Sequence, residues 1–249
     1  MRWKLENILK KNGGSILLEN DSVIILNKPS GLLVLPDRFN LVAPNLYELL
    51  METFGTIFVV HRIDRETSGV VLFAKNAEMH ALLNTMFERR QMEKIYRAIV
   101  VGIPHADGGC IDLPISENDH GIRKMKIDWK NGKEAVTEYT VIEKFKGYAL
   151  VEAKPLTGRT HQIRLHLSAI ELPILADPLY GSGGRFFLSS VKRNYKSHGE
   201  EKPILARTAL HAFSLSFRYP KSGEMTFIEA PMPHDMDTVL KVLKKYQGS

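Results

Sequence analysis

Cysteine, tryptophan and long apolar runs are scarce in this sequence. Its 249 residues include one cysteine and two tryptophans. Cys110 has no partner for an internal disulfide, which fits a reducing compartment, so we expect a cytoplasmic protein. No apolar run approaches the roughly 20 residues that a membrane-spanning helix needs. The N-terminal segment, interrupted by Glu6, lacks the apolar block of a signal peptide. We therefore expect a soluble protein with no membrane partner.

The charge is positive overall and unevenly distributed. Lys and Arg number 34 against 28 Asp and Glu, a formal net charge of +6. Basic residues gather in two segments that we interpret as loops, residues 122–133 and 185–207. Such segments are able to line the path of a polyanion. Solvated loops that merely keep a protein soluble have the same composition, and the charge alone leaves both interpretations open.

Apolar periodicity and turn residues predict more strands than helices. Strands are expected at residues 21–27, 95–101, 135–142, 148–154, 210–219 and 225–230. Helices are expected at residues 45–53, at 76–87, from about residue 160 and at 236–246, with caps at Asn76 and Asp235. Residues 181–203 form the one long segment without a regular pattern.

The order of these elements indicates the fold class. Strands and helices do not alternate strictly, so we predict an α+β fold with a mixed, largely antiparallel central sheet and flanking helices. A doubly wound parallel sheet is disfavoured for the same reason. No internal repeat is evident, and we expect a single domain over residues 1–249, with its core at about 15–235.

Residues 61–69, HRIDRETSG, place a carboxylate among cations between two apolar runs. Asp64 stands between Arg62 and Arg65, and nearby positive charges keep a carboxylate ionised. An ionised carboxylate acts as a nucleophile, a base or a metal ligand. The structural alternative is a turn aspartate whose oxygens accept backbone amides.

A second polar cluster, residues 157–164 or TGRTHQIR, lies at the expected start of a helix. Arg164 is the natural partner for Asp64, because a guanidinium holds a carboxylate through two hydrogen bonds. Polar residues at a helix start also contact phosphate through the first backbone amides. An ordinary surface arginine is the alternative for Arg164.

Several common sites are disfavoured by the sequence. His161 and His166 are five residues apart, which is the wrong spacing for a zinc pair on one helix face, so no metal is expected. Residues 181–185, GSGGR, lack the ending of a phosphate-binding loop. No Gly-x-Ser-x-Gly elbow marks a hydrolase serine.

Residues 61–69 resemble the signature HR-[LI]-D-x-x-T-S-G of the RluA-type RNA pseudouridine synthase family. Further segments resemble motifs of this family in the same order along the chain. They are residues 27–32, 93–98, 157–164, 176–181, 210–212 and 229–231. The resemblance spans roughly residues 22–233, so we expect the pseudouridine synthase fold with an RNA-binding cleft.

The resemblance implies an isomerase that converts uridine in RNA to pseudouridine without a cofactor or metal. Asp64 would be the nucleophile, attacking either the ribose C1′ or the uracil C6, and the sequence leaves both open. Tyr96 would stack on the base and help remove the C5 proton. Arg164 would pair with Asp64. The expected substrate is structured rRNA or tRNA, with stem-loops favoured because their bases unstack more easily.

The same resemblance assigns residues to RNA binding. Arg62 would fill the space that the flipped uridine leaves, and Ile163 would form part of the pocket wall. The remaining RNA-contacting residues are expected to be His61, Thr67, Arg159, Thr160, His161, Arg123, Lys124 and Lys126. We expect a monomer that does not act on DNA. We also expect no separate RNA-binding domain of the kind that many relatives carry, because the N-terminal segment is too short for one.

Two departures from the family pattern stand out. Ala176 occupies a turn position where glycine is usual, and His211 follows smaller residues than is common.

Two other functions compete with the isomerase. One is an RNA-binding protein without catalysis, although an acid near phosphates does not favour binding. The other is a hydrolase that uses Asp64 and water to release free base.

Overall fold

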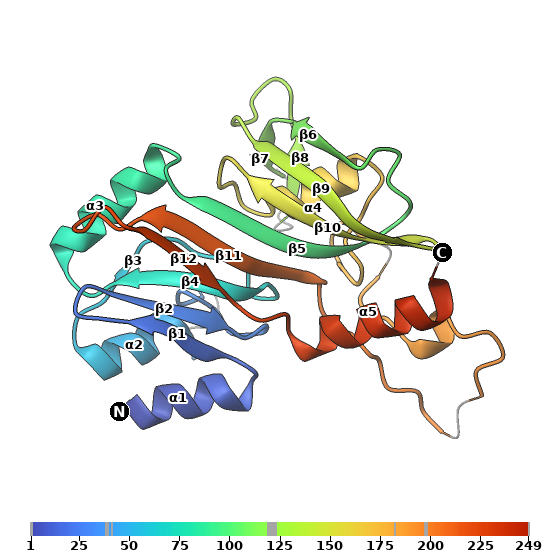
Figure 1. The fold of residues 1–249 in the computed structure, drawn as a ribbon, viewed down its shortest axis with the longest axis horizontal. Coiled ribbons are helices and arrows are strands. Elements are labelled where there is room, and N and C mark those ends of the chain that lie inside the picture. Colours follow the sequence, from blue (N-terminus) through green and yellow to red (C-terminus); the bar gives the residue numbers. More distant parts are fainter. Residues whose placement is uncertain are drawn as a thin grey trace. The chain divides into compact units, whose positions relative to one another are not determined.

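The chain folds into two compact units, each with its own strands and buried core. The computed structural model describes residues 2–37, 40, 42–118, 124–181, 183–196 and 199–248. The first unit comprises Met1–Ile95 and His211–Pro231, and the second comprises Tyr96–Leu210 and Met232–Ser249 (Figure 1).

The first unit is built on a mostly antiparallel sheet. Its strands follow the order β1, β2, β4, β11, β12, and β3 pairs with β4. Their bounds are β1 Ser15–Glu19, β2 Val23–Lys28, β3 Phe58–Val59, β4 Ser68–Ala74, β11 Leu210–Arg218 and β12 Met225–Glu229. Strands β4 and β11 pair in parallel, whereas the other pairings described in this unit are antiparallel. Strands β2 and β4 are buried along their whole length, so their sequences are continuous rather than alternating apolar runs.

Three helices belong to this unit. They are α1 Arg2–Lys11, α2 Leu46–Phe54 and α3 Ala77–Glu88. Helix α1 packs against α2 and β1, and α3 packs against β3 and β4 (Figure 1). The side chain of Asn76 accepts the Met79 amide at 2.9 Å, which confirms the predicted cap of α3. Helix α1, which was not predicted, is mostly polar and buries Leu5 and Leu9.

The second unit contains an antiparallel sheet and a separate hairpin. Strand β5 (Glu93–Val101) runs into this unit and is followed across the sheet by β10 (Tyr148–Pro155), β9 (Val136–Phe145) and β6 (Gly108–Asp112). Strands β9 and β10 form the predicted hairpin around residues 146–147. The separate hairpin consists of β7 (Ile115–Glu117) and β8 (Met125–Ile127).

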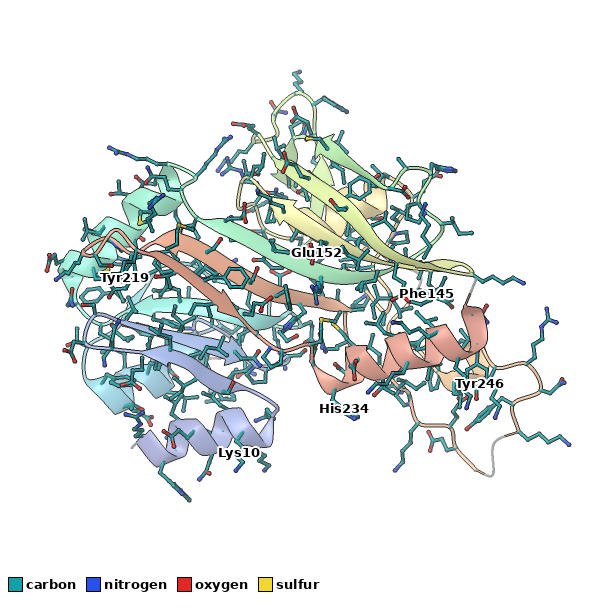
Figure 2. All side chains as sticks on the ribbon, in the orientation of Figure 1. Lys10, Phe145, Glu152, Tyr219, His234 and Tyr246 are labelled. Atoms are coloured by element: carbon teal, nitrogen blue, oxygen red, sulfur yellow. The ribbon has the colours of Figure 1, made fainter. Side chains whose placement is uncertain are left out.

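Helices α4 (Gln162–Ala169) and α5 (His234–Gln247) complete the second unit, with a short 3-10 helix, η1, at Leu188–Ser190. The apolar face of α5 enters the same buried cluster as Phe145 at the end of β9, which Figure 2 labels. Helix α4 contributes Ile163 and Leu167 to this cluster. Among the described residues, no helix combines the length and apolar character needed to cross a bilayer.

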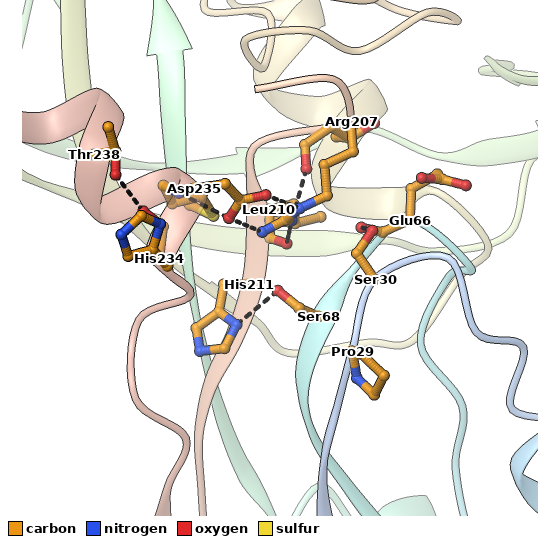
Figure 3. A network of polar contacts seen from close by, with 12 residues as sticks. Pro29, Ser30, Glu66, Ser68, Arg207, Leu210, His211, His234, Asp235 and Thr238 are labelled. Carbon is orange, nitrogen blue, oxygen red and sulfur yellow. Dashed lines mark hydrogen bonds and ion pairs between the residues drawn. The ribbon is translucent and has the colours of Figure 1, made fainter. Parts of the chain in front are cut away.

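The predicted α+β class with largely antiparallel sheet structure is confirmed, but two local predictions are wrong. The basic segment 122–133 is not a loop throughout, because β8 lies within it. Helix α5 begins at His234 without a side-chain cap; Asp235 instead binds Arg207 through Nε and Nη2, at 2.7 and 2.8 Å (Figure 3). The described part of segment 181–203 has no longer regular element than η1, and a backbone bridge joins Phe186 to Leu205.

Candidate active site

Asp64 lies in the segment that connects β3 to β4. We call residues 61–67 the Asp64 loop. The Asp64 side chain is half-buried, and its carbonyl oxygen accepts the Thr67 amide at 3.2 Å, which closes a turn. Ile63 and Thr67 on either side are buried. The loop is therefore anchored by its neighbours while the Asp64 carboxylate keeps partial access to solvent.

The segment after β2 holds the backbone of the Asp64 loop in place. Lys28 is fully buried, and its ammonium donates to the carbonyl oxygens of Pro29 at 2.9 Å, Leu32 at 2.7 Å and Arg65 at 3.0 Å. The carbonyl of Arg65 also accepts the Gly31 amide at 2.9 Å. Charge-assisted hydrogen bonds are stronger than neutral ones, so this ammonium fixes the loop one residue from Asp64.

Ser30 adds a further contact to the same backbone. Its hydroxyl donates to the Glu66 carbonyl at 2.7 Å (both residues are labelled in Figure 3). Arg65, which is exposed, turns back to donate from Nε to the Gly31 carbonyl at 3.1 Å. These contacts tie residues 28–31 to the two residues that follow Asp64. A rigid loop of this kind suits a reactive group that must stay in one geometry.

His61 begins the Asp64 loop as a neutral ring. Its Nε2 accepts the Leu72 amide at 3.0 Å, and the ring stacks on Phe87 with 5.0 Å between centroids. Burial, reinforced by the charge of Lys94, lowers the pKa of His61 to about 3. Burial lowers the pKa of Lys94 as well. His61 therefore supports the loop as a hydrogen-bond acceptor, and its predicted contact with RNA stays a prediction.

The loop ends where β4 and β11 come into close contact. Gly69 has φ +113°, and a Cβ at this position would collide with the backbone of Ala212. Only glycine combines this backbone conformation with such close approach, which explains the glycine in the HRIDRETSG segment. Ser68 and His211, paired across the same strands, form a hydrogen bond of 2.9 Å between Oγ and Nδ1 (Figure 3).

His211 is fully buried, and its hydrogen bonds define its tautomer. Its Nε2 lies 3.2 Å from the carbonyl oxygen of Ala230, which can only accept. Nε2 is therefore a donor, and in the neutral ring Nδ1 accepts the Ser68 hydroxyl. The departure from the family pattern at His211 is thus a buried polar link between β4, β11 and the end of β12.

Arg164 forms a buried, bidentate ion pair with Asp177. Nε and Nη2 lie 2.7 and 2.8 Å from the two carboxylate oxygens, and Arg164 is only 5% exposed. Burial by itself would raise the pKa of the Asp177 carboxyl, but the hydrogen bonds and charge of Arg164 outweigh it and hold this pKa below its usual range. Asp177 therefore orients the guanidinium as a fixed cation.

The turn containing Asp177 organises the surroundings of Arg164. Asp177 Oδ1 accepts the amides of Leu179 at 2.9 Å and Tyr180 at 3.2 Å. The guanidinium of Arg164 lies over the Tyr180 ring, 5.3 Å from its centroid. Ala176 adopts φ +57°, a left-handed conformation that explains why glycine is the usual residue at this turn position.

Tyr180 also joins α4 to the basic hairpin. Its hydroxyl accepts the Met125 amide at 2.7 Å and lies 3.0 Å from His161 Nδ1. The ammonium of Lys124 lies 5.3 Å from the centroid of the Tyr180 ring. Two cations, Lys124 and Arg164, are thus gathered around one ring by cation–π contacts.

Gln162, at the start of α4, is the centre of a buried hydrogen-bond network. Its Oε1 accepts the Thr157 hydroxyl at 2.8 Å and the Arg159 amide at 2.9 Å. Its Nε2 donates to the Val136 carbonyl at 2.9 Å and the Thr137 hydroxyl at 3.0 Å. All four polar functions of the amide have partners. The 157–164 segment is therefore held to β9 by side chains rather than by a helix cap.

His166 extends this network on α4. Its Nε2 donates to the Leu113 carbonyl at 2.9 Å, and Nδ1 lies 3.0 Å from the Thr137 hydroxyl. Burial lowers the pKa of His166, against smaller opposing effects of the Leu113 carbonyl and Asp112. A neutral His166 is consistent with this arrangement.

Tyr96 lies on β5, opposite Ala153 of β10. It is half-buried and packs against the core of the second unit. Its neighbour Arg97 forms an ion pair with Glu152, labelled in Figure 2, at 3.0 Å across the two strands. The pairing of β5 with β10 thus fixes the backbone position of Tyr96.

The remaining predicted RNA-contacting residues are mostly accessible. Arg62, Arg159 and Thr160 are exposed, and Arg159 Nε donates to the Glu134 carbonyl at 2.9 Å. Lys124 and Lys126 are half-buried, whereas Ile163 is buried in α4. Arg123 lies outside the described residues. Asp64 belongs to the first unit, and Tyr96 and Arg164 belong to the second, so their joint action stays a proposal.

Two structural contributors were given no role by sequence reasoning. Lys28 and Asp177 both lie in segments that resemble family motifs, yet both are polar residues that the fold buries completely. For Lys28, the only signal in the sequence is its position at the end of an apolar strand. Asp177 lies before a proline in a turn, and this pattern gives no indication of an ion pair. Across the described residues, no group of three or more metal-binding side chains occurs.

Comparison with known proteins identifies the family. The family model described as RNA pseudouridylate synthase matches residues 22–169. "Ribosomal large subunit pseudouridine synthase D" of Neisseria meningitidis serogroup B is 38% identical over 238 residues, 94% of this chain and 62% of that protein. The protein of the same name from Zymomonas mobilis is 36% identical over 92% of this chain and 72% of its own length. The chain belongs to the RNA pseudouridylate synthase family.

A solved structure agrees with this assignment. "Human RNA Pseudouridylate Synthase Domain Containing 4" superposes with a TM-score of 0.71 at 26% identity, covering 98% of both chains. The chain spans less than two thirds of the length of the Neisseria relative. Residues 22–169, which match the family model, contain Lys28, Asp64, Tyr96 and Arg164.

Proposed function

We propose that this protein converts uridine to pseudouridine in RNA of the large ribosomal subunit. The observation that carries the proposal is the family match over residues 22–169, which includes the clamped Asp64 loop. Substrate choice is supported by the Neisseria and Zymomonas relatives, whose names specify the large ribosomal subunit. A stem-loop is the expected target, because its bases unstack at lower cost than those of a continuous helix.

In the proposed reaction, the Asp64 carboxylate attacks the uridine at C1′ or at C6. The glycosidic bond between C1′ and N1 breaks, and the base turns while it is held. C5 then bonds to C1′, and the proton on C5 passes to solvent while N1 gains one. No atom of the uridine other than this exchanged proton is replaced, so the reaction balances without an oxidant or a reductant.

The other predicted site residues have distinct roles in this proposal. Tyr96 stacks on the uracil and helps to remove the C5 proton. Arg164, held by Asp177, orients the carboxylate of Asp64. Arg62 occupies the space vacated by the uridine, whose extrusion costs a few kcal/mol. Lys124 and Lys126 contact RNA phosphates, which makes binding depend on salt.

Release of tritium from C5 tests the proposed reaction directly. RNA of the large subunit labelled with tritium at uridine C5 is incubated with the protein. A synthase releases tritium and leaves the strand intact. A hydrolase leaves abasic sites that break in mild base, and a binding protein does neither; either result would overturn the proposal. Small-subunit RNA and tRNA labelled in the same way test the substrate class.

A salt titration tests the assignment of the lysines. Neutralising Lys124, Lys126 and Lys130 together should weaken RNA binding and reduce the slope of log Kd against log salt by about 0.7 for each lost phosphate contact on single-stranded RNA. An unchanged slope would show that the segment is a solvated surface with no part in RNA binding.

A further inference from the structure

Trp129 is an exposed aromatic residue in the turn that follows β8. We call residues 128–132 the Trp129 turn. The side chain of Trp129 is 76% exposed. Single exposed apolar residues are common on protein surfaces, so exposure alone assigns no role. What distinguishes Trp129 is the construction of the turn, the charges around it and the residues to which it is joined.

The Trp129 turn is fixed by Asp128. The Oδ1 atom of Asp128 accepts the amides of Lys130 at 3.1 Å and Asn131 at 3.0 Å. Its Oδ2 accepts the Ser116 hydroxyl at 3.0 Å, and its carbonyl accepts the Gly132 amide at 2.9 Å. A Cβ at Gly132 would collide with the carbonyl of Asp128. The backbone that carries Trp129 is therefore held in one conformation before any partner binds.

Cations surround this aromatic residue along the chain. Lys130 follows Trp129 directly and is exposed, and Lys133 is exposed one residue beyond the turn. Lys126 reaches back to Asp128, with Nζ 3.9 Å from Oδ2. An exposed aromatic side chain in a segment rich in lysine matches a nucleotide, whose base stacks while its phosphates bind the cations. An apolar protein surface would gain nothing from the lysines.

The turn is also joined to the 157–164 segment. Lys133 and Ile115 exchange two backbone hydrogen bonds of 2.9 Å. The next carbonyl, that of Glu134, accepts Nε of Arg159 at 2.9 Å. Arg159 in turn donates its amide to Gln162 at the start of α4. The Trp129 turn and the segment that carries Arg164 are thus connected by hydrogen bonds within the second unit.

We propose that Trp129 stacks on an unpaired base of the RNA substrate, other than the uridine that reacts, while Lys130 and Lys133 contact the adjacent phosphates. This inference rests on the proposed function and adds a nucleotide subsite to it. Because the turn is preorganised, binding costs little ordering of the protein. The subsite favours RNA with a single-stranded flank over a continuous duplex.

Tryptophan fluorescence gives a direct test, because the chain has only two tryptophans, Trp3 and Trp129. The Trp3→Phe variant leaves Trp129 as the single indole, and the Trp129→Phe variant leaves Trp3, which is similarly exposed at 77%. Each variant is titrated with a 12-nucleotide oligouridylate and with a 12-base-pair RNA duplex. We expect saturable quenching of Trp129 by the single strand, weaker quenching by the duplex, and no quenching of Trp3.

Affinity measurements separate stacking from charge. Trp129→Ala should weaken binding of the single strand by about 5- to 150-fold, the range of one base–aromatic stack. Trp129→Tyr should restore most of this loss. The plot of log Kd against log salt should stay parallel for Trp129→Ala, whereas Lys130→Ala should lower its slope. Trp3→Ala is the matched control and should bind as the unaltered protein does.

Several outcomes would overturn the subsite. One is that the Trp129 emission does not change on addition of RNA, and another is that Trp3→Ala weakens binding as much as Trp129→Ala. The third is that ribosomal proteins freed of RNA change the emission, whereas neither the oligouridylate nor the RNA duplex does. Tritium release is measured in parallel for the Trp3→Phe variant. Normal release without Trp129 quenching removes the subsite and leaves the proposed function intact. Quenching without tritium release removes the proposed function and leaves the binding site.

Discussion

The buried ammonium of Lys28 lies 3.0 Å from the carbonyl oxygen of Arg65, the residue next to Asp64. The two residues are 37 positions apart in the sequence, with helix α2 and strand β3 between them, yet this contact holds the backbone of the Asp64 loop next to Asp64. The carboxylate of Asp64, the proposed nucleophile, is thus positioned by a lysine that binds the backbone carbonyl of the next residue. Replacing Lys28 therefore tests how far the reaction depends on this backbone contact.

Lys28→Met should lower kcat for tritium release at least tenfold while leaving the Kd for RNA within about threefold. Methionine preserves the side-chain volume but removes the donor to the carbonyls of Pro29, Leu32 and Arg65. The Arg65 carbonyl keeps the Gly31 amide, whereas a buried carbonyl left unsatisfied costs about 1–3 kcal/mol. Single-turnover kinetics measure the first quantity and filter binding the second. Lys75→Met, which removes a 3.3 Å ion pair with Glu19 elsewhere in this unit, is the control. Equal rates for both variants would refute the positioning role.

Asp177→Ala should destabilise the protein by about 3–5 kcal/mol, because it leaves the buried Arg164 cation without its carboxylate. Urea unfolding at pH 7 measures the loss. Glu152→Ala removes an ion pair that is about a quarter exposed, with Arg97, and should cost less than about 1 kcal/mol. Similar losses for the two variants would mean that the Arg164–Asp177 pair is no more important to folding than a surface pair.

Gly69→Ala should destabilise the protein by more than about 3 kcal/mol, because its Cβ would meet the Ala212 backbone of the neighbouring strand. Gly31→Ala is the matched substitution. Gly31 also has a positive φ, +83°, but a Cβ there meets no atom within 4 Å, so backbone strain of about 1 kcal/mol is expected. Thermal unfolding of the two variants distinguishes collision from strain, and equal losses would contradict the close approach of β4 and β11.

His61 should make stability depend on pH below neutrality. Its folded-state pKa of about 3 lies below the ordinary value of 6.5, so the unfolded chain binds its proton first. The stabilisation from His61 is complete above pH 6.5 and is lost as pH falls toward 3, at up to about 1.4 kcal/mol per pH unit.

Urea unfolding between pH 7 and pH 4 measures this dependence. His61→Gln should show a shallower loss of stability than the unaltered protein, while His166, whose pKa is also lowered, contributes to both. His105→Gln, at an exposed position, is the control. Parallel curves for all three proteins would show that His61 is not held neutral by the fold.

Elements with a strong local signal were predictable from the sequence. The apolar runs of β2 and β4 and the Asn76 cap of α3 correspond to the observed structure because burial and capping act within a few residues. Helix α1 was missed because its apolar stripe is narrow: only Leu5 and Leu9 are buried. Asp235 looked like a cap, but a guanidinium 28 residues away, Arg207, takes its carboxylate instead.

The chemistry of the site was predictable only in part, for the same reason. The Asp64 segment was recognisable as a dense polar motif between apolar runs. Its supports were not, because Lys28 reaches Arg65 across 37 residues and Asp177 reaches Arg164 across 13. Sequence spacing gives no measure of such contacts. Likewise, Gly69 belongs to a recognisable sequence motif, but glycine is required there because the backbone of Ala212 in β11 lies so close.

The central claim is that the carboxylate of Asp64 reacts with the flipped uridine. Asp64→Asn keeps the size of the side chain but replaces one carboxylate oxygen with an amide nitrogen, which removes the charge and most of the nucleophilicity. Glu66→Gln makes the same change two residues away, at a side chain that is 42% exposed. Comparison of the two variants distinguishes loss of the carboxylate at position 64 from loss of one negative charge anywhere in the loop.

Single-turnover tritium release from C5-labelled large-subunit RNA, with protein in excess, is the most direct measurement. We expect Asp64→Asn to lower the rate by at least a thousandfold with RNA affinity within about threefold of the unaltered protein, and Glu66→Gln to retain a rate within about threefold. Release by Asp64→Asn at a rate near that of the unaltered protein would contradict the account, because another group would then be the nucleophile.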